Sequence, residues 1–324
     1  MQGHQKAAAL MVISMGLFAF EDVFIKLLTA SLPTGVIMAC LGIAGGLLFW
    51  GLMAARGIRL WSRDLLHPMV VLRNLGEAGC AVCYASALAI GDLSTASAII
   101  QALPLTMTLG AALLLGEQVG WRRWVSIIVG FVGVLLIVRP GSQAFQLASL
   151  LALGAVAMLT VRDLATRRVP AHVSSDALTA SAFLATGLAG IALAVFQHAT
   201  VRLPAGGEVA YLFAALCFGL GGYLSMVIAT RIAPVAAIAP FRYARIVFAL
   251  ILGVVIFGER PDALTLLGAV IIVGSGIYTM WREARRKRRD SWAPADHAGN
   301  VSVMVDPPRR DLPEERQDTG GPAR

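Results

Sequence analysis

The segment LLLGEQVGWRRWVSIIVGFVGVLLI, residues 113–137, has a second version in the same chain, VVIFGERPDALTLLGAVIIVGSGIY at residues 254–278. In this alignment Gly116-Glu117 matches Gly258-Glu259 at an offset of 142 residues. Similarity between apolar segments is common, but glycine–glutamate pairs in register are not. The match therefore predicts that the chain contains an internal repeat.

The repeat extends back to the first charged segment of each copy. EDVFIK at residues 21–26 aligns with RDLATR at residues 162–167, at an offset of 141. Aspartates coincide in this alignment, and so do the basic residues that end the two hexapeptides. Charged residues in register over more than a hundred residues indicate a duplicated unit.

The composition is that of a membrane protein. Of the 324 residues, 57% are hydrophobic and 14% are charged, and the mean hydropathy is +0.74. Soluble domains have about 45–50% apolar and about 25% charged residues. The net charge of +8 does not indicate nucleic acid, because most basic residues lie in short loops or directly after the last apolar segment. We therefore expect the lipid bilayer, and no nucleic acid, among the partners.

Segments long enough to cross a bilayer, about 20 mainly apolar residues each, are predicted at ten places. They cover residues 7–29, 33–55, 69–90, 94–116, 121–139, 146–167, 177–197, 209–230, 236–257 and 262–281. Each copy of the repeat contains five of them. Because five is odd, the second copy must be inserted upside down relative to the first, which is an arrangement found in transporters.

The predicted fold class is an all-α polytopic membrane protein of ten transmembrane helices in two inverted five-helix repeats. The predicted domains are residues 1–141, residues 142–281 and a basic, then disordered tail at 282–324. Lys and Arg are more frequent in the loops on the side of the N-terminus, which predicts that both termini are cytoplasmic and that the protein lies in the inner (plasma) membrane. Two complete halves in one chain predict that a monomer suffices for a pathway.

The motifs of both copies resemble the EamA family of the drug/metabolite transporter (DMT) superfamily. The first copy has ALPLTMTLGAALLLGE (102–117) and GFVGVLLIVRPG (130–141), and the second has APFRYARIVFALILGVVIFGERPDALTLLGAVIIVGSG (239–276). The resemblance covers about residues 7–281. It implies ten helices around a central cavity. It also implies a small-molecule substrate, among amino acids, vitamins and other metabolites, that moves in either direction.

The first apolar segment contains Glu21, Asp22 and Lys26. Asp22 and Lys26 have the i, i+4 spacing of a helical ion pair, which predicts a structural pair at an outer gate, repeated in inverted form by Asp163 and Arg167. Glu21 has no acidic counterpart in the second copy. An ionisable residue inside the bilayer is costly and usually functional, so Glu21 is the candidate for proton coupling.

A second charged group is predicted in the inner half of the helices. Arg73 and Glu77 have i, i+4 spacing, and a contact of Glu77 with Arg242 or Arg245 is expected from their similar depth. Two interpretations of the surplus of arginines remain open. The arginines bind a carboxylate or phosphate of the substrate, or they form a network of ion pairs that closes an inner gate.

Other polar residues complete the predicted site. Gln101 and Tyr243 are equivalent by the repeat and lie near prolines, which release backbone carbonyls for a ligand or a kink. Tyr84 is a candidate for stacking on a flat substrate. Glu117 and Glu259 are expected to cap helix ends.

The predicted function is secondary transport of a small polar or amphipathic metabolite, amino-acid-like, vitamin-like or otherwise anionic or zwitterionic, by alternating access. Protons are a candidate coupling ion. No catalytic, metal-ligating or cofactor-binding pattern is present, so we do not expect an enzyme. The alternative is a membrane-embedded sensor, scaffold or enzyme without a recognisable motif.

Overall fold

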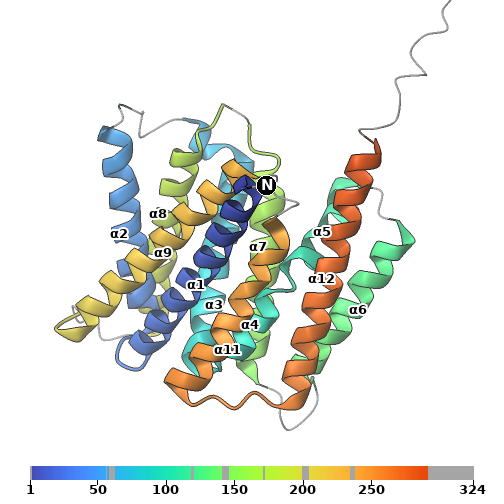
Figure 1. The fold of residues 1–324 in the computed structure, drawn as a ribbon. Coiled ribbons are helices and arrows are strands. Elements are labelled where there is room, and N and C mark those ends of the chain that lie inside the picture. Colours follow the sequence, from blue (N-terminus) through green and yellow to red (C-terminus); the bar gives the residue numbers. More distant parts are fainter. Residues whose placement is uncertain are drawn as a thin grey trace, which may run out of the picture. The chain divides into compact units, whose positions relative to one another are not determined.

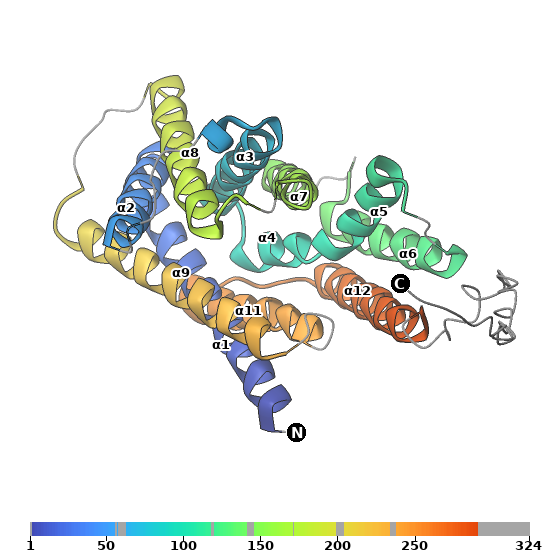
Figure 2. The ribbon, with the colours of Figure 1, turned by 90° about the horizontal axis from the view of Figure 1, so that it is seen from above.

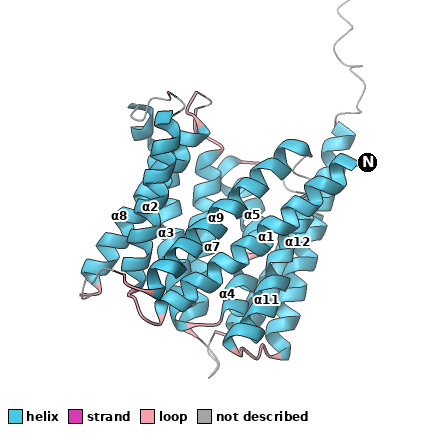
Figure 3. Ribbon diagram, turned by 60° about the vertical axis from the view of Figure 1, so that its left-hand side comes forward, coloured by secondary structure: helices cyan, strands magenta, loops and turns pink. Residues whose placement is uncertain are grey.

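The computed structural model describes residues 2–55, 57, 63–117, 120–140, 146–170, 172–198, 204–233 and 238–290. Within these ranges every regular element is helical, and there is no strand (Figure 3). The compact unit extends to Arg286 and is described here by itself. The all-α class predicted from the sequence is confirmed.

The first half runs from α1 to α6 (Figure 1). Its elements are α1 (Gln2–Thr29), α2 (Thr34–Ala55), the short 3₁₀ helix η1 (Arg63–Leu66), α3 (Pro68–Ile90), α4 (Leu93–Ile100), α5 (Leu103–Leu115) and α6 (Trp121–Val138).

The second half repeats this order. Its elements are α7 (Leu147–Thr166), α8 (Ser175–Phe196), α9 (Gly207–Ile232), the 3₁₀ helix η2 (Ala239–Tyr243), α11 (Ala244–Phe257) and α12 (Ala263–Asp290).

Nine segments of the described chain are long and apolar enough to cross a membrane, with α4–α5 and η2–α11 each counted as one segment. The remaining long helix, α3, has a less apolar sequence because it contains Arg73, Asn74 and Glu77. It packs against α7 and α8. The protein is therefore a polytopic membrane protein with the predicted succession of spans.

The fourth span of each half is broken at the same place. The prediction of one helix over residues 94–116 is wrong in this respect, because α4 ends at Ile100 and α5 begins at Leu103 with Pro104 in its first turn. Pro240 occupies the first turn of η2 in the second half. Proline lacks a backbone N–H and cannot continue a regular helix. The repeat thus places a break in both of these spans.

The repeated Gly-Glu motif ends a helix in both halves. Gly116 follows α5 with φ of 67°, and Gly258 follows α11 with φ of 65°. Glycine adopts this left-handed conformation without steric cost and is the common residue there. The motif therefore positions the glutamate that follows directly beyond the helix end.

Packing between the helices follows the repeat, because the most extensive interfaces join one half to the other. Helix α1 packs on α9, as α7 packs on α3. Helix α1 also packs on α11, as α7 packs on α4 and α5. Helices α2 and α8 pack on each other, and Figure 2 shows α4 between α7 and α11. Neither half forms a separate core.

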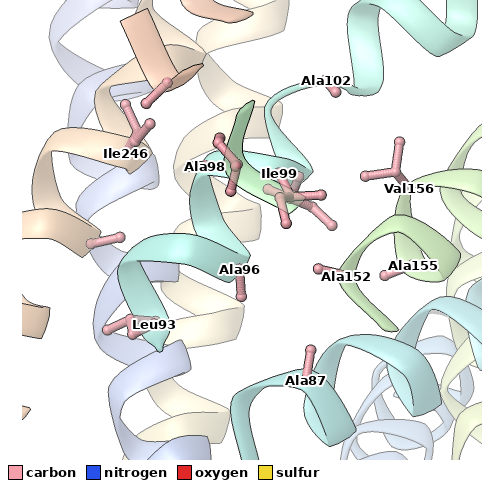
Figure 4. Packing of buried hydrophobic residues seen from close by; sticks show 14 of the residues in the cluster. Ala87, Leu93, Ala96, Ala98, Ile99, Ala102, Ala152, Ala155, Val156 and Ile246 are labelled. Atoms are coloured by element: carbon pink, nitrogen blue, oxygen red, sulfur yellow. The ribbon is translucent and has the colours of Figure 1, made fainter. Parts of the chain in front are cut away.

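Small residues allow this close packing. The largest cluster of buried apolar residues includes Ala87, Ala96, Ile99, Ala152 and Ile246, contributed by α3, α4, α7 and α11. Figure 4 shows the alanines of α4 and α7 facing each other across a short gap, with Ile246 on the other side of α4. Small side chains let backbones approach in a bilayer, where van der Waals packing drives association.

Candidate functional site

The central ion pair joins α1 to α11. Nη2 of Arg245 donates to both carboxylate oxygens of Asp22, at 2.9 and 2.7 Å. The Tyr84 hydroxyl from α3 donates to the same carboxylate at 3.1 Å and lies 3.3 Å from the Ser97 hydroxyl of α4. Asp22 is buried. Residues from both halves therefore meet at one carboxylate.

The expected pair of Asp22 with Lys26 is not the one in the structure. Lys26 instead forms an ion pair with Glu259 at 2.7 Å and donates to the Gly91 carbonyl oxygen at 2.8 Å. Asp22 and Lys26 lie one turn apart on α1, but each finds a stronger partner on another helix. A bidentate arginine contact outweighs the few tenths of a kcal/mol that an i, i+4 pair contributes.

Glu259 caps a helix that is remote in the sequence. Its carboxylate accepts hydrogen bonds from the backbone N–H groups of Leu93 and Ser94, at 2.6 and 3.0 Å, and from the Ser94 hydroxyl at 2.5 Å. These groups form the first turn of α4, whose own Asp92 makes no side-chain cap. A carboxylate at a helix N-terminus is stabilised by the unpaired N–H groups and the helix dipole.

We call Lys26, Glu259, Leu93 and Ser94 the opposite-face cluster. It lies on the face where α1 ends, opposite the N-side face where α1 begins. The repeat assigns it a counterpart on the N-side face, because Arg167 is equivalent to Lys26 and Glu117 to Glu259. Arg167 and Glu117 are indeed in contact, at 3.2 Å, and we call them the N-side pair.

The two equivalent contacts differ sharply in exposure. The side chains of Lys26 and Glu259 are 15% and 4% exposed. Those of Arg167 and Glu117 are 48% and 51% exposed. A pocket of about 140 Å³ adjoins the N-side pair and includes Pro104 and Thr279 in its lining. The contact on the opposite face is therefore buried, whereas its equivalent on the N-side face is exposed.

The second aspartate of the repeat also has a different partner from the one expected. Asp163 pairs with Arg162 at 2.7 Å rather than with Arg167, and Arg162 also pairs with Glu77 at 3.0 Å. Arg73, the expected partner of Glu77, donates instead to the Leu178 carbonyl oxygen at 2.9 Å and to Asn74 at 3.1 Å. The expected contacts of Glu77 with Arg242 and Arg245 are absent from the described residues.

Gln101 and Tyr243 lie at the breaks in the fourth spans of the two halves. The Gln101 side-chain amide donates to the Arg242 carbonyl oxygen at 3.1 Å. Tyr243 is buried, and its hydroxyl has no hydrogen-bond partner in the described part of the chain. That hydroxyl lies against the backbone of Gly276 on α12. Glu21 lies against Gly219 of α9, on the same side of α1 as Phe18, which faces Gly222.

Three contributors were not among the predicted residues. Ser94 and Arg162 each bind a carboxylate. Ser97 lies within hydrogen-bonding distance of the Tyr84 hydroxyl, which donates to the carboxylate of Asp22. Serines are common in apolar helices and give no signal by themselves. Arg162 did give a signal in the sequence, because a cation in a span requires an anion nearby. In the described residues no group of three His, Cys, Asp or Glu side chains could hold a metal ion.

The stability of the opposite-face cluster depends on pH. Burial of Glu259 would raise the pKa of its carboxyl, but hydrogen bonds from Lys26, Ser94 and Leu93 outweigh burial and lower this pKa below its ordinary value of 4.5. The pKa is thus lower in the folded state than in the unfolded state. The contribution to stability is complete above the unfolded value and is lost as pH falls through the lowered, folded value.

We expect Glu259→Gln to lower the free energy of unfolding by about 1–3 kcal/mol at pH 7, because it removes the charge from these hydrogen bonds. Thermal unfolding of the wild-type and variant proteins between pH 7 and pH 3 measures the difference. The two midpoints should converge as the pH falls through the lowered pKa. A difference that stays constant over the whole pH range would contradict the assignment.

Comparisons with known proteins agree with this architecture. The model of the EamA-like transporter family matches residues 5–139 and again residues 146–281. A crystal structure of a protein 22% identical superimposes with a TM-score of 0.57 over 86% of this chain and 99% of that one. At this identity the superposition shows a shared fold.

Relatives with named functions are transporters. The S-adenosylmethionine uptake transporter of Rickettsia prowazekii is 27% identical over 69% of this chain and 74% of its own length. The riboflavin transporter of Vibrio cholerae is 27% identical over 74% and 72%. The pseudopaline exporter of Pseudomonas aeruginosa is 29% identical over 82% and 92%.

These relatives belong to the DMT superfamily, and the family model covers both halves of the chain. The chain belongs to the EamA-like transporter family.

Proposed function

We propose that this protein moves a small polar metabolite, anionic or zwitterionic, across the inner membrane by alternating access. We further propose that the N-side face is cytoplasmic, because Lys and Arg predominate in its loops. The named relatives support small-molecule transport, and they include proteins of uptake as well as export.

One observation carries the proposal: two contacts that are equivalent by the repeat differ in burial. An inverted repeat allows one sequence pattern to form a closed contact on one face while its equivalent is open on the other. The opposite-face cluster is buried here, and the N-side pair is exposed. This supports a state in which the path is closed on the opposite face and open on the N-side face.

The alternative state follows from the same symmetry. The N-side pair would become buried while the opposite-face cluster separates and exposes Lys26 and Glu259. Both states contain one closed contact of the same residue types, so their free energies can lie within a few kcal/mol of each other. A solute can shift such an equilibrium by binding one state more tightly than the other.

Glu21 is the proposed proton-coupling group. It lies in the interior of α1, against the backbone of Gly219. It makes no hydrogen bond or ion pair among the described residues, whereas the neighbouring Asp22 is bound by Arg245. A carboxylate without a counter-ion in a span is suited to binding and releasing a proton.

Thiol labelling tests alternating access without any knowledge of the substrate. Cys80 on α3 is partly buried and lies within electrostatic reach of Glu77, Arg162 and Arg245, so its labelling requires that the reagent reach the centre of the protein. The other cysteines, Cys40, Cys83 and Cys217, would be replaced by alanine. Labelling rates with a membrane-impermeant methanethiosulfonate are then compared in spheroplasts and in inverted vesicles.

We expect Cys80 to react from the N-side face and to be protected from the opposite face. Glu259→Gln should increase labelling from the opposite face by about tenfold or more, because the lost contacts stabilise the closed face by about 1–3 kcal/mol. Glu117→Gln is the matched control, since it should leave the opposite face closed. Unchanged protection in Glu259→Gln, or equal labelling from both faces of the wild type, would reject the proposal.

A further inference from the structure

Besides Lys26, whose charge is compensated by Glu259, eight charged residues lie three or more residues from the ends of the spans and of α3. Four are acidic and four are basic, so their formal charges cancel. They are Glu21, Asp22, Arg73, Glu77, Arg162, Asp163, Arg242 and Arg245. Five of them are combined in the ion pairs of Asp22 with Arg245 and of Arg162 with Glu77 and Asp163. Arg73 is bound to a carbonyl oxygen of α8. Glu21 and Arg242 remain.

Glu21 differs from its repeat equivalent in having no partner of opposite charge. Its equivalent, Arg162, pairs with Glu77 of α3. At the offset of 142 residues, Glu77 corresponds to Gly219 on α9. A Cβ atom at Gly219 would lie 2.6 Å from Oε1 of Glu21, so a larger residue there would require this carboxylate to move. In the second half, the charged residue at this position, Arg162, therefore has an ion-pair partner. In the first half, Glu21 forms no ion pair with any described residue.

Arg242 also has no direct contact with a group of opposite charge in the described part of the chain, although Asp163 lies within its electrostatic reach. The carbonyl oxygen of Arg242 is bound by Gln101, but its guanidinium makes no hydrogen bond or ion pair with any described residue. Its side chain is exposed, although it lies within the span Ala239–Phe257. A guanidinium that faces hydrocarbon is costly. The charged residues within electrostatic reach of Arg242 include Arg162 and Asp163 of α7, which places its guanidinium toward the centre of the protein.

The two groups lie around the same central pair. Glu21 is adjacent in sequence to Asp22 and within electrostatic reach of Arg245. Arg242 precedes Arg245 by three residues, about 5 Å along a helix axis, and is also within its electrostatic reach. Helix α1 packs directly against η2. Glu21 on α1 and Arg242 on η2 are therefore both near the central ion pair.

We propose that Glu21 and Arg242 bind the two ends of a zwitterionic metabolite, and this inference rests on the proposed transport function. The guanidinium of Arg242 binds the carboxylate in bidentate geometry. Glu21 binds the cationic centre, an ammonium or a sulfonium. A zwitterion adds no net charge to eight residues whose charges already cancel, whereas a simple anion would leave Glu21 unpaired. The Glu21 carboxylate stays available for a proton when no cation occupies it.

Of the charged residues that the sequence favoured for substrate binding, this assignment keeps Arg242 and leaves out Arg245 and Glu77. Arg245 and Glu77 are each held by a partner within the protein. A ligand that bound them would have to break an ion pair inside the membrane. Glu21 and Arg242 bind a ligand without that cost, so they determine specificity and the ion pairs hold the helices.

Binding measurements with charge-deleted ligands test the proposal. The purified full chain is titrated calorimetrically with the amino acids, with betaines and with amino-acid-bearing nucleosides. Each binder is compared with its carboxamide, which lacks the carboxylate, and its N-acetyl form, which lacks the ammonium. We expect the wild type to bind a zwitterion at least about tenfold more tightly than either derivative.

The variants should divide this preference between them. Arg242→Gln should bind the zwitterion and its carboxamide equally well, but should still prefer the zwitterion to its N-acetyl form. Glu21→Gln should bind the zwitterion and its N-acetyl form equally well, but should still prefer the zwitterion to its carboxamide. Arg260→Gln, at an exposed site, and Glu208→Gln, at a half-buried site in the first turn of α9, are matched controls that should keep both preferences.

Three outcomes would overturn the inference. In the first, both variants bind every ligand more weakly by the same factor. In the second, both variants keep the ligand preferences of the wild type. In the third, the wild type binds no zwitterion in the panel. None of them removes the proposed transport function, because Cys80 labelling decides alternating access without a ligand. If instead that labelling showed no alternation while the crossed preferences held, the site would stand and the mechanism would fail.

Discussion

Asp22→Asn should lower the free energy of unfolding by about 3–5 kcal/mol, because it leaves the charge of Arg245 uncompensated inside the membrane. The pair is bidentate, with distances of 2.9 and 2.7 Å, and Asp22 is 2% exposed. The Tyr84 hydroxyl also loses its carboxylate acceptor. Reversible unfolding in mixed detergent micelles, followed by circular dichroism, measures the loss.

A paired replacement distinguishes a lost charge partner from lost packing. Asp22→Leu combined with Arg245→Met removes both charges and keeps much of the volume, and such replacements are often close to neutral. We expect the double variant to be more stable than either single variant. Asp262→Asn is the surface control: this carboxylate pairs with Arg139 at an exposed position, where a pair contributes about 0–1 kcal/mol. A double variant less stable than Asp22→Asn would show that the charges are not the main term.

Gly42→Leu should separate α2 from α8 and destabilise the protein by about 1–3 kcal/mol or more, the usual cost of overpacking. A Cβ atom at Gly42 would lie 2.3 Å from the Gly187 nitrogen and 2.5 Å from its Cα atom. These are backbone atoms, so relief requires a shift of a whole helix. The thermal unfolding midpoint of the purified protein measures the effect.

Gly51→Leu is the matched control on the same helix. A Cβ atom at Gly51 meets no atom within 4 Å, and leucine has a higher helix propensity than glycine. This variant should be neutral or slightly stabilising. If both variants were equally destabilised, loss of glycine itself rather than the α2–α8 approach would be responsible.

The spans could be predicted from the sequence because the bilayer fixes their length and polarity. The segment predicted at residues 33–55 is α2 at Thr34–Ala55, and the one predicted at 121–139 is α6 at Trp121–Val138. The exception is the break after Ile100. Pro104 indicated a disturbance, but hydropathy alone could not distinguish a kinked helix from two helices separated at Gln101.

The partners of the charged residues could not be predicted from spacing along one helix. The i, i+4 rule paired Asp22 with Lys26 and Arg73 with Glu77, and the structure joins each of these four residues to a segment remote in the sequence. Interhelical packing decides such contacts, and one sequence does not determine it. The repeat did contain a signal for two of these contacts. One position is basic in both copies (Lys26 and Arg167), another is acidic in both (Glu117 and Glu259), and the residues at these positions form the two equivalent ion pairs.

The cap of α4 has a consequence for how the chain is synthesised. Leu93 enters the membrane 166 residues before Glu259, whose carboxylate binds its N–H group. Until the second half is translated, the first half lacks both the carboxylate that caps α4 and the arginine that pairs with Asp22. These contacts can therefore form only after α11 and Glu259 have been synthesised. Maturation of the first half depends on completion of the second.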